Sequence, residues 1–568
     1  MLPPMRPSPI IPSCTSSAPF GCGRSASAPP EASKHRAPGF GGEPACQSWR
    51  PSRRPTRAPR KMNRVLMIGL DAAEVTLVQR WMQEGALPNL RRMVDRGAFG
   101  QLGSTAEWLV GSPWPSFYSG QPPEEHGLYH YLVWRPDRMN AARPTREWLP
   151  IRPFWRRIAE SGRRVIAVDV PIAYAPDEFP GLEISGWATH ETLEPPSAHP
   201  PELLDWARKT FGSLRFDDEQ NRPLSAAELL AVRDQCVRTA RTVADLGVAL
   251  MRREAWDLFL ICFASTHRGG HALWSSANLA GEASPQQATA LKAALKDVYV
   301  ACDEAVGKLV EQAGPETISL VFSLHGMGPN TARADLLREM LERIVSDEQG
   351  EGQPRIGLAR RLRGVVPLRV RAKIKQRLPH ALQDRLTQFW RTGGIDWSQS
   401  RAFQVFGDLE GYIRVNLRGR ESAGIVEPGR EYEELCERLA DGLRTFVDED
   451  TGEPVVGRIG RRETLYPTGS RSALLPDMIV RWSPTPAADH RMIVSRRYGS
   501  IPWPTPGRHP QGRSGNHLGK GFLIAAGDAV PVGSTMDHAH ILDIAPTVYG
   551  LLGLRAPDEM RGRSLLVR

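Results

Sequence analysis

The sequence predicts an α/β protein built as a three-layer α/β/α sandwich, and two observations carry this prediction. First, short and continuously apolar runs such as RVLMIGL and WDLFLICF alternate with longer segments of helical periodicity. Such strands are typical of a mostly parallel sheet whose two faces are both covered by helices. Second, the 568 residues are enough for a large buried core, in one elaborated domain or in several.

Strand and helix patterns follow one another along the chain. The predicted strands are 64–71, 164–171, 256–266, 317–326, 411–417, 476–482 and 521–527. The predicted helices are a stretch with Leu77, Trp81 and Leu87, the segment FWRRIAESG, and residues 226–254, 288–313 and 540–554. Regular strand–helix alternation up to residue 330 predicts the parallel part of the sheet.

The net charge of +10 is concentrated in the first part of the chain. Residues 1–62 hold ten Lys or Arg, two Glu and thirteen prolines. The other residues hold 63 basic and 61 acidic side chains, so a nucleic-acid partner is not expected. The composition of 1–62 indicates a disordered tail, or an upstream extension of a protein that starts at Met62.

We expect a catalytic core in two parts, with an insert between them. The first part is 63–330, in which 135–235 forms the substrate side or cap, and the second part is 396–568. The insert, 331–395, is helical in periodicity and carries eleven Lys or Arg between Arg355 and Arg391. It is interpreted as a solvated amphipathic insert packed on the core, with an anion- or lipid-facing surface as the alternative.

Cysteine usage and hydropathy indicate a cytoplasmic protein. The four cysteines after residue 62 have no CxxC spacing and form no dense framework, which fits a reducing compartment. No stretch approaches the roughly 20 apolar residues that a membrane helix needs, so no transmembrane segment is expected.

Polar side chains gather where the predicted strands end. Asp71 ends the first strand, His267 and His271 follow the third, and His325 ends the fourth. Because the carboxyl ends of parallel strands line one crevice, we expect these side chains to lie together. The i, i+4 spacing of His267 and His271 suits two imidazoles that bind one ion from one helical face.

Two glycines and one late histidine complete the pattern. Gly269 and Gly270, between the first two histidines, predict a turn looser than a regular helix. His517 lies among small residues in SGNHLGKG, where a backbone can approach a ligand closely. The cluster therefore predicts a metal site, although each histidine alone would more often be a structural residue.

Five segments occur in the same order as in a known family: IGLDAAE, PWPSFYSGQPPEEHGLY, FSLHGMG, NHLGKGFLIAAG and ILDIAPTVYGLLGL. Over most of 63–568, apart from the insert, they resemble the type I phosphodiesterase/nucleotide pyrophosphatase branch of the alkaline phosphatase superfamily. The resemblance implies an alkaline-phosphatase-like α/β/α sandwich and two adjacent metal ions, usually zinc. It also implies a Thr or Ser nucleophile that takes a covalent phosphoryl group.

The resemblance implies that four residues bind metal: Asp71, His271, His325 and His517. Three positions depart from the family pattern. His267 and Leu324 stand where the family has aspartates, and Val110 stands at the position of the nucleophile. Ser112 is the nearest hydroxyl in the same loop.

These departures change the expected metal content. The loss of two carboxylates removes about two negative charges that would hold the ions of a two-metal site. We therefore expect one zinc ion at His267, His271 and His517, because three histidines with an open fourth position can form a catalytic zinc site. A second ion, near Asp71 and His325, is left open.

The expected function is metal-dependent hydrolysis of a small phosphorylated substrate, a phosphate ester or diester. Either Ser112 attacks phosphorus in line, or a metal-bound hydroxide attacks directly and no covalent intermediate forms. Arg414 and Asn416 are candidate substrate-binding residues, although a strand arginine is more often paired structurally. The alternative is a catalytically degenerate family member that binds a ligand or a partner.

Three other histidines are not expected to bind metal. His126 follows two glutamates and is expected to order its loop. His538 and His540 precede the terminal helix, where surface or capping roles are expected.

Overall fold

The computed structural model describes residues 63–566, with gaps at 177, 190–192, 215–221, 277–278, 350–394, 408–409, 487–490 and 504–511. The chain divides into two units, Met1–Arg50 and Pro51–Arg568, and all described residues belong to the second. The predicted tail 1–62 lies outside the described residues, as does the basic stretch from Arg355 to Arg391. The boundaries predicted for the tail, the insert and the two parts of the core stay predictions.

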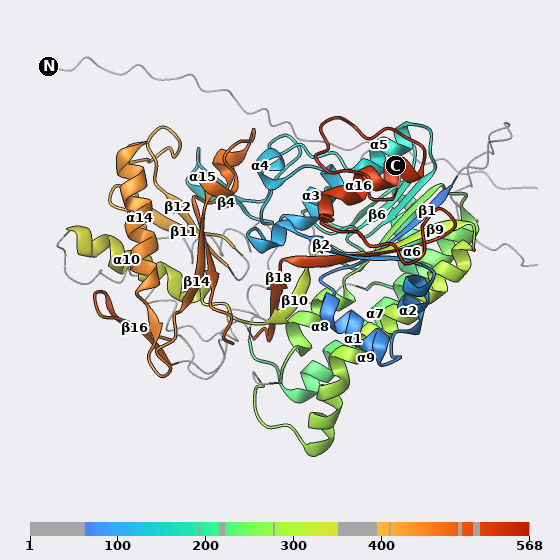
Figure 1. Cartoon of the computed structure of the whole chain (residues 1–568), viewed down its shortest axis with the longest axis horizontal. Coiled ribbons are helices and arrows are strands. Elements are labelled where there is room, and N and C mark those ends of the chain that lie inside the picture. Colours follow the sequence, from blue (N-terminus) through green and yellow to red (C-terminus); the bar gives the residue numbers. More distant parts are fainter. Residues whose placement is uncertain are drawn as a thin grey trace, which may run out of the picture. The chain divides into compact units, whose positions relative to one another are not determined.

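An eight-stranded sheet forms the centre of the described fold (Figure 1). Its strands, in spatial order, are β2 (Gly97–Gly103), β19 (Lys520–Ala526), β9 (Thr317–Ser323), β1 (Arg64–Leu70), β8 (Leu258–Phe263), β5 (Val165–Val168), β6 (Leu182–Ser185) and β7 (Ser197–His199). The strands from β9 to β6 are parallel, whereas β2, β19 and β7 run antiparallel to their neighbours. The four strands predicted before residue 330 are thus all present in a mostly parallel sheet.

Alternate residues of the parallel strands enter two separate cores. In β1, Val65 and Met67 pack on one face of the sheet, and Leu66 and Ile68 pack on the other. The first face is covered by α3 (Pro113–Ser119), α5 (Phe154–Glu160) and α16 (Ile544–Leu551). The second face is covered by α1 (Val75–Gln83), α2 (Pro88–Asp95), α6 (Glu202–Phe211), α7 (Ala226–Arg253) and α9 (Pro285–Ala313). The predicted three-layer sandwich is confirmed.

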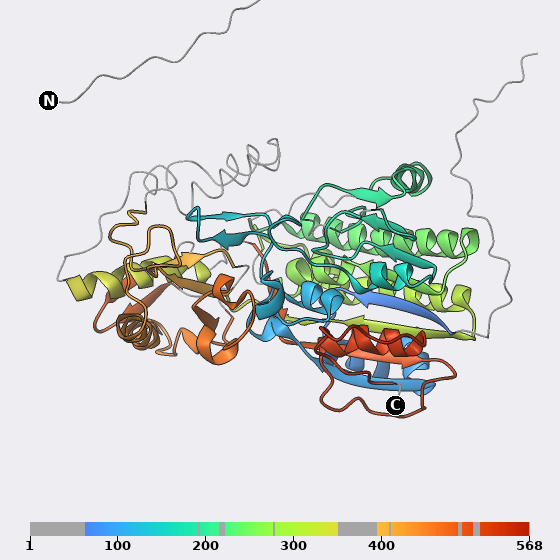
Figure 2. The same cartoon turned by 90° about the horizontal axis from the view of Figure 1, so that it is seen from above.

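The long helices α7 and α9 both begin at a capping box. At α7, the Ser225 hydroxyl accepts a hydrogen bond from the backbone N–H of Glu228, and the Glu228 carboxylate accepts one from the Ser225 backbone. Ser284 and Gln287 make the same pair at α9. Such boxes satisfy N–H groups that have no partner within the helix. The two helices lie side by side along the sheet (Figures 1 and 2) and so hold the strands that end at the polar residues.

A second, antiparallel sheet has a core of its own on one face. Its strand order is β11 (Ala402–Val405), β12 (Gly411–Val415), β15 (Met478–Trp482) and β14 (Val456–Arg461). The elements that share this core are α10 (Ala334–Gln349), α14 (Arg430–Arg444), β16 (Met492–Ser495) and β17 (Gly499–Pro502), with β13 (Val447–Asp448) paired to β16. Of the three strands predicted after residue 400, only β19 joins the central sheet.

The reason for this difference is that β12 and β15 pair with each other and have two buried faces. Ile413 and Val480 face the core shared with α10 and α14, whereas Tyr412 and Ile479 face the first core of the central sheet. A strand that is apolar on both faces gives no local signal of which sheet it joins.

Short elements complete the described fold. They are β3 (Val133–Arg135), β4 (Asn140–Ala142), β10 (Gly326–Pro329), β18 (Gly515–Leu518), α4 (Pro123–His126), α8 (Ser265–Leu273) and α15 (Arg462–Leu465). In the described part of the chain, we find no helix with the length and apolar character required to cross a membrane.

Candidate metal centre

Three adjacent parallel strands bring the candidate residues to one edge of the central sheet. Asp71 directly follows β1, His267 and His271 lie on α8 just after β8, and His325 comes after β9. The strands β9, β1 and β8 are neighbours, so their carboxyl ends meet. All four side chains are at most 3 % exposed.

The helix α8 is a regular α-helix, which corrects the looser turn predicted at Gly269 and Gly270. Its glycine at 270 has a packing reason instead. A Cβ on Gly270 would lie 2.8 Å from Cγ of Met327, and a Cβ on Gly515 would lie 2.1 Å from the backbone oxygen of Gly270. Gly270 thus leaves room for the Met327 side chain on β10, and Gly515 lets the backbone of β18 approach the backbone of α8.

β18 brings His517 to this helix. The backbone N–H of Ser514 donates to the carbonyl of His271 over 2.8 Å, and the Ser514 hydroxyl donates to the carbonyl of Ala272 over 3.1 Å. β18 also pairs antiparallel with β10, where His517 lies opposite Met327. Because β10 follows directly after His325, the same ribbon sets His517 beside that residue.

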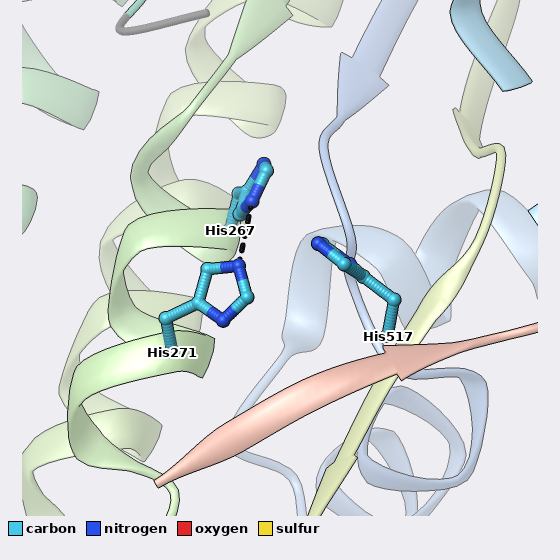
Figure 3. Close-up of side chains that lie close together, drawn as sticks. All are labelled: His267, His271 and His517. Atoms are coloured by element: carbon cyan, nitrogen blue, oxygen red, sulfur yellow. Dashed lines mark hydrogen bonds between the residues drawn. The ribbon is translucent and has the colours of Figure 1, made fainter. Parts of the chain in front are cut away.

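The imidazoles of His267, His271 and His517 converge (Figure 3). Their candidate ligand nitrogens all lie within 4.8 Å of one another, and the distances between ring centroids are 4.7 to 4.8 Å. Two of the rings extend from one helix, and the third extends from a strand that begins near the end of this helix. His325 is 4.7 Å from His517 but 6.2 Å from His267 between centroids, so it borders the cluster.

Hydrogen bonds set the tautomers of two of these rings. Nδ1 of His267 lies 2.6 Å from Oδ2 of Asp71, and Nδ1 of His271 lies 2.9 Å from the carbonyl oxygen of Gly515. Carbonyl oxygens and ionised carboxylates only accept hydrogen bonds, so both Nδ1 atoms carry the proton. Nε2 of each neutral ring is then left with its lone pair.

The pKa values of this cluster favour an ionised Asp71 and neutral side chains at His271, His325 and His517. Burial alone would raise the pKa of Asp71. The electrostatic interaction and the hydrogen bond with His267 outweigh burial and hold that pKa well below its usual value. Burial lowers the pKa of His271 to about 3 and that of His325 to about 4, and it also lowers the pKa of His517. At neutral pH these imidazoles are therefore uncharged and can act as ligands.

The donor set fits a metal ion. The two Nε2 atoms of His267 and His271 lie 3.0 Å apart, where two lone pairs repel each other unless a cation or proton lies between them. Two nitrogens that bind one zinc ion tetrahedrally, each at about 2.0–2.1 Å, lie about 3.3 Å apart. Imidazole nitrogen is a common zinc ligand, and three such donors leave a fourth position open.

The candidate nucleophile Ser112 has a different environment. It lies at the N-cap of α3, is fully buried, and donates from Oγ to the carbonyl of Leu109 over 2.6 Å. Its Oγ is also 2.7 Å from Oγ1 of Thr105. Val110, at the position of the family nucleophile, donates its backbone N–H to the hydroxyl of Tyr412 over 3.1 Å. Within the described residues, these bonds tie the loop to itself and to the second sheet.

Of the two predicted substrate-binding residues, Arg414 lies on β12 of the second sheet and Asn416 directly follows that strand. Arg414 is fully buried, donates to Oε1 of Glu421 from two nitrogens, and reaches three backbone carbonyls with the third. Asn416 is also fully buried and donates to the carbonyl of Trp397. The contacts of Arg414 fit the structural alternative, and a substrate-binding role of either residue stays a prediction.

The three histidines not expected to bind metal lie outside this cluster, and His126 ends a helix rather than beginning the next element. His126 ends α4, and its ring contacts the Ser116 hydroxyl at 2.9 Å and accepts from the backbone N–H of Leu128. His540 caps the short turn before α16, and His538 is exposed.

The sequence alone did not reveal the residues that orient the cluster. Trp114 donates from Nε1 to Oδ1 of Asp71 over 2.8 Å, and Gly515 accepts from His271. The motif PWPSF contains Trp114, but a tryptophan there is equally typical of a core. The SGNH segment contains Gly515, and its small residues are the one signal of a close backbone approach.

We expect Gly515→Ala to weaken zinc binding about 10- to 100-fold, the range seen when a contact that orients a metal ligand is lost. The added methyl group would collide with the Gly270 carbonyl and displace both β18 and the acceptor of His271. Competition with a chromophoric chelator measures the affinity. Gly269→Ala is the matched control, because its Cβ would meet Val298 at an ordinary 3.4 Å. Equal affinities of the two variants would contradict the proposed packing role.

The fold and the site together define an α/β protein with a buried histidine cluster at the carboxyl edge of its parallel strands. The chain belongs to the type I phosphodiesterase / nucleotide pyrophosphatase family, whose model matches residues 65–471. Asp71, His267, His271 and His325 lie within the matched residues, and His517 lies beyond them. The predicted class of enzyme, a phosphodiesterase-type hydrolase, is confirmed at the level of the family.

The chain is also distantly similar to solved structures. A phosphonoacetate hydrolase from Sinorhizobium meliloti in complex with phosphonoformate is 14 % identical, with a TM-score of 0.47. Murine and human ectonucleotide pyrophosphatase/phosphodiesterase 5 are 13 % and 12 % identical, with TM-scores of 0.43 and 0.44; the murine protein is an inactive variant in complex with AMP. Each match covers 87 % of this chain and 96 % of the other. No curated protein matches the sequence, and the family assignment rests on the family model.

Proposed function

We propose that this protein is a zinc-dependent hydrolase of phosphate esters or diesters, with the ion held by His267, His271 and His517. One observation carries the proposal: the Nε2 atoms of His267 and His271 face each other at 3.0 Å while their Nδ1 protons are already donated. This arrangement is suited to a cation and costly without one. Membership of a phosphodiesterase family supports the phosphorylated substrate.

A zinc ion bound to three neutral imidazoles would supply Lewis-acid polarisation of a phosphoryl oxygen and of water. The chain's own residues hold that position and restrict access to it. The ligands are at most 3 % exposed, so the site excludes most bulk water and strengthens electrostatic interactions within it. After burial and the neighbouring histidines, the charge of Arg513 also lowers the pKa of His517. Arg513 is thus a candidate contact for an anionic substrate.

For the attacking group, the contacts favour water over Ser112. A nucleophilic hydroxyl needs a base within hydrogen-bond reach. Ser112 Oγ contacts the Leu109 carbonyl and the Thr105 hydroxyl, and neither of these groups can accept its proton as a base at neutral pH. We therefore propose direct attack by water at phosphorus, without a covalent phosphoseryl intermediate.

We expect Ser112→Ala to retain kcat/KM within about tenfold of the wild type, equivalent to about 1.4 kcal/mol in the barrier. The loss of its hydrogen bonds changes stability more than chemistry, so a thermal melt run in parallel identifies any unfolded fraction. Single-turnover reactions quenched in acid measure the intermediate directly. Trapped phosphoserine, or a loss of activity of several orders of magnitude in a folded variant, would establish Ser112 as the nucleophile.

The test of the function is a substrate panel on the metal-loaded protein. We expect hydrolysis of p-nitrophenyl esters of phosphate, as mono- or diesters, that is abolished by a chelator and restored by Zn²⁺. A folded protein that binds no metal and hydrolyses none of these esters would favour the alternative, a family member that binds a ligand or a partner. Two observations lie behind that alternative: Leu324 offers no carboxylate, and Val110 offers no hydroxyl. The cytoplasmic location stays a prediction.

A further inference from the structure

We infer that Asp71 does not bind a metal ion but orients His267, so that the site holds a single ion. This inference rests on the zinc site proposed above and deepens it. It assigns the carboxylate at the end of β1 to positioning, whereas the sequence resemblance implies a metal ligand there. The sequence leaves open whether a second ion binds near Asp71 and His325. The inference implies that it does not, and that each chain holds one ion.

The first observation is that both oxygens of Asp71 are already bonded from within the protein. Oδ1 accepts from Nε1 of Trp114 over 2.8 Å, and Oδ2 accepts from Nδ1 of His267 over 2.6 Å. Asp71 and Trp114 are 1 % and 2 % exposed. A carboxylate that accepts a hydrogen bond from Nδ1 of a metal-binding histidine fixes the orientation of the ring. It also makes the Nε2 lone pair more basic, so that Nε2 binds the metal ion more strongly.

The second observation is that a second ion would find too few donors. Leu324 is fully buried in the apolar core, and Val110 offers no side-chain donor while its backbone N–H is bonded to Tyr412. Of the positions that the family resemblance assigns to the second ion, Asp71 and His325 remain. Nδ1 of His325 is buried and has no hydrogen-bond partner among the described residues, but catalytic zinc sites use three protein ligands. Two donors, one of them already bonded twice, do not make such a site.

The third observation is the charge of the buried cluster. Asp71 is a buried carboxylate that hydrogen-bonds to it. One divalent ion with one carboxylate leaves a net charge of about +1, whereas two ions would leave about +3 in a site almost closed to water. The electrostatic cost therefore also favours one ion.

Metal stoichiometry and affinity, measured without reference to activity, test the inference. Purified protein is loaded with Zn²⁺ or Co²⁺, dialysed and analysed by elemental mass spectrometry. We expect one ion per chain for the wild type. Asp71→Asn is expected to hold one ion at saturation, with the affinity reduced about 10- to 100-fold. Its Co²⁺ absorption spectrum is expected to shift, because the reoriented ring of His267 changes the ligand field.

Asp169→Asn is the matched control. Asp169 directly follows β5, is 1 % exposed, and accepts hydrogen bonds from the backbone N–H groups of Trp187 and Ala188 rather than from a histidine. It is expected to leave the Co²⁺ spectrum unchanged. Two ions per wild-type chain, or a drop in stoichiometry in Asp71→Asn, would overturn the inference while leaving the hydrolase proposal intact. One ion per chain with the expected affinity change but no ester hydrolysis would support the inference and count against the hydrolase. A wild type that binds no ion would overturn both.

Discussion

His517→Ala is expected to release the bound zinc and to lower kcat/KM for a phosphate ester by about three orders of magnitude or more. Catalytic zinc sites use three protein ligands, and the variant keeps only the two on α8. Lewis-acid stabilisation of the transition state is worth several kcal/mol, and each 1.36 kcal/mol corresponds to a factor of ten in rate. Elemental analysis and initial rates on the same sample measure both effects.

His538→Asn is the control for this change. His538 is exposed and has a backbone φ of 54°, a left-handed conformation that asparagine tolerates better than alanine. We expect this variant to keep the wild-type zinc content and activity. If His517→Ala also kept one ion per chain and a tenth of the activity, the three-histidine centre would be wrong.

Asp477→Asn is expected to lower the free energy of unfolding by about 3–5 kcal/mol, the cost of breaking a buried ion pair from one side. Asp477 is fully buried and accepts from both terminal nitrogens of Arg420 at 2.6 Å, and from the backbone N–H of Val415 at 2.7 Å. The asparagine amide in the variant has one acceptor oxygen in place of two, and its NH₂ group would face a guanidinium or backbone donor. Urea unfolding at neutral pH measures the loss.

Asp441→Asn is the matched control, because Asp441 is 79 % exposed and pairs with Arg444, which is 57 % exposed. Its effect is expected to stay within about 0.5 kcal/mol. A loss in Asp477→Asn no larger than in this control would show that the buried ion network contributes little to stability.

The same carboxylate predicts a pH dependence. Burial alone would raise the pKa of Asp477, but the charges of Arg420, Arg414 and Arg462 and the hydrogen bonds from Arg420 hold it well below 3.8. A depressed native pKa stabilises the fold above the unfolded value, and this contribution is lost as the pH falls through the native pKa. Below about pH 4 the wild type should therefore lose stability faster than Asp477→Asn, and the difference between them should shrink.

The parallel strands of the central sheet could be predicted because the apolar residues of each strand match its buried position between two layers of helices. β1 and β8 are buried on both faces, so their residues are apolar without alternation. Ser225 and Ser284 are N-cap residues, and each marks the position where a long helix begins. The edge formed by β2 and β19 could not be predicted. β2 contains three glycines, and its partner lies some 420 residues later, so nothing local specifies that pairing.

The residue types of the candidate metal ligands could be predicted from the sequence, but the directions in which the side chains of the site point could not. Histidines after successive strands, and one late histidine in a known motif, indicated the cluster. Arg414 shows the limit of such reasoning, since the strand pattern YIRVN does not specify the direction in which the arginine points. Its partner Glu421 follows seven residues later and neutralises it inside the core. An arginine and a glutamate at that spacing are too common to signal a buried pair.

The docking of β18 against α8 has a consequence for biosynthesis. The acceptor that fixes the ring of His271 belongs to Gly515, 244 positions further along the chain, and the third imidazole follows two residues after it. During translation, α8 would leave the ribosome long before either residue exists. Zinc loading should accordingly be a late event, confined to chains in which β18 has already been synthesised and docked, and nascent chains halted before that strand should emerge without the ion.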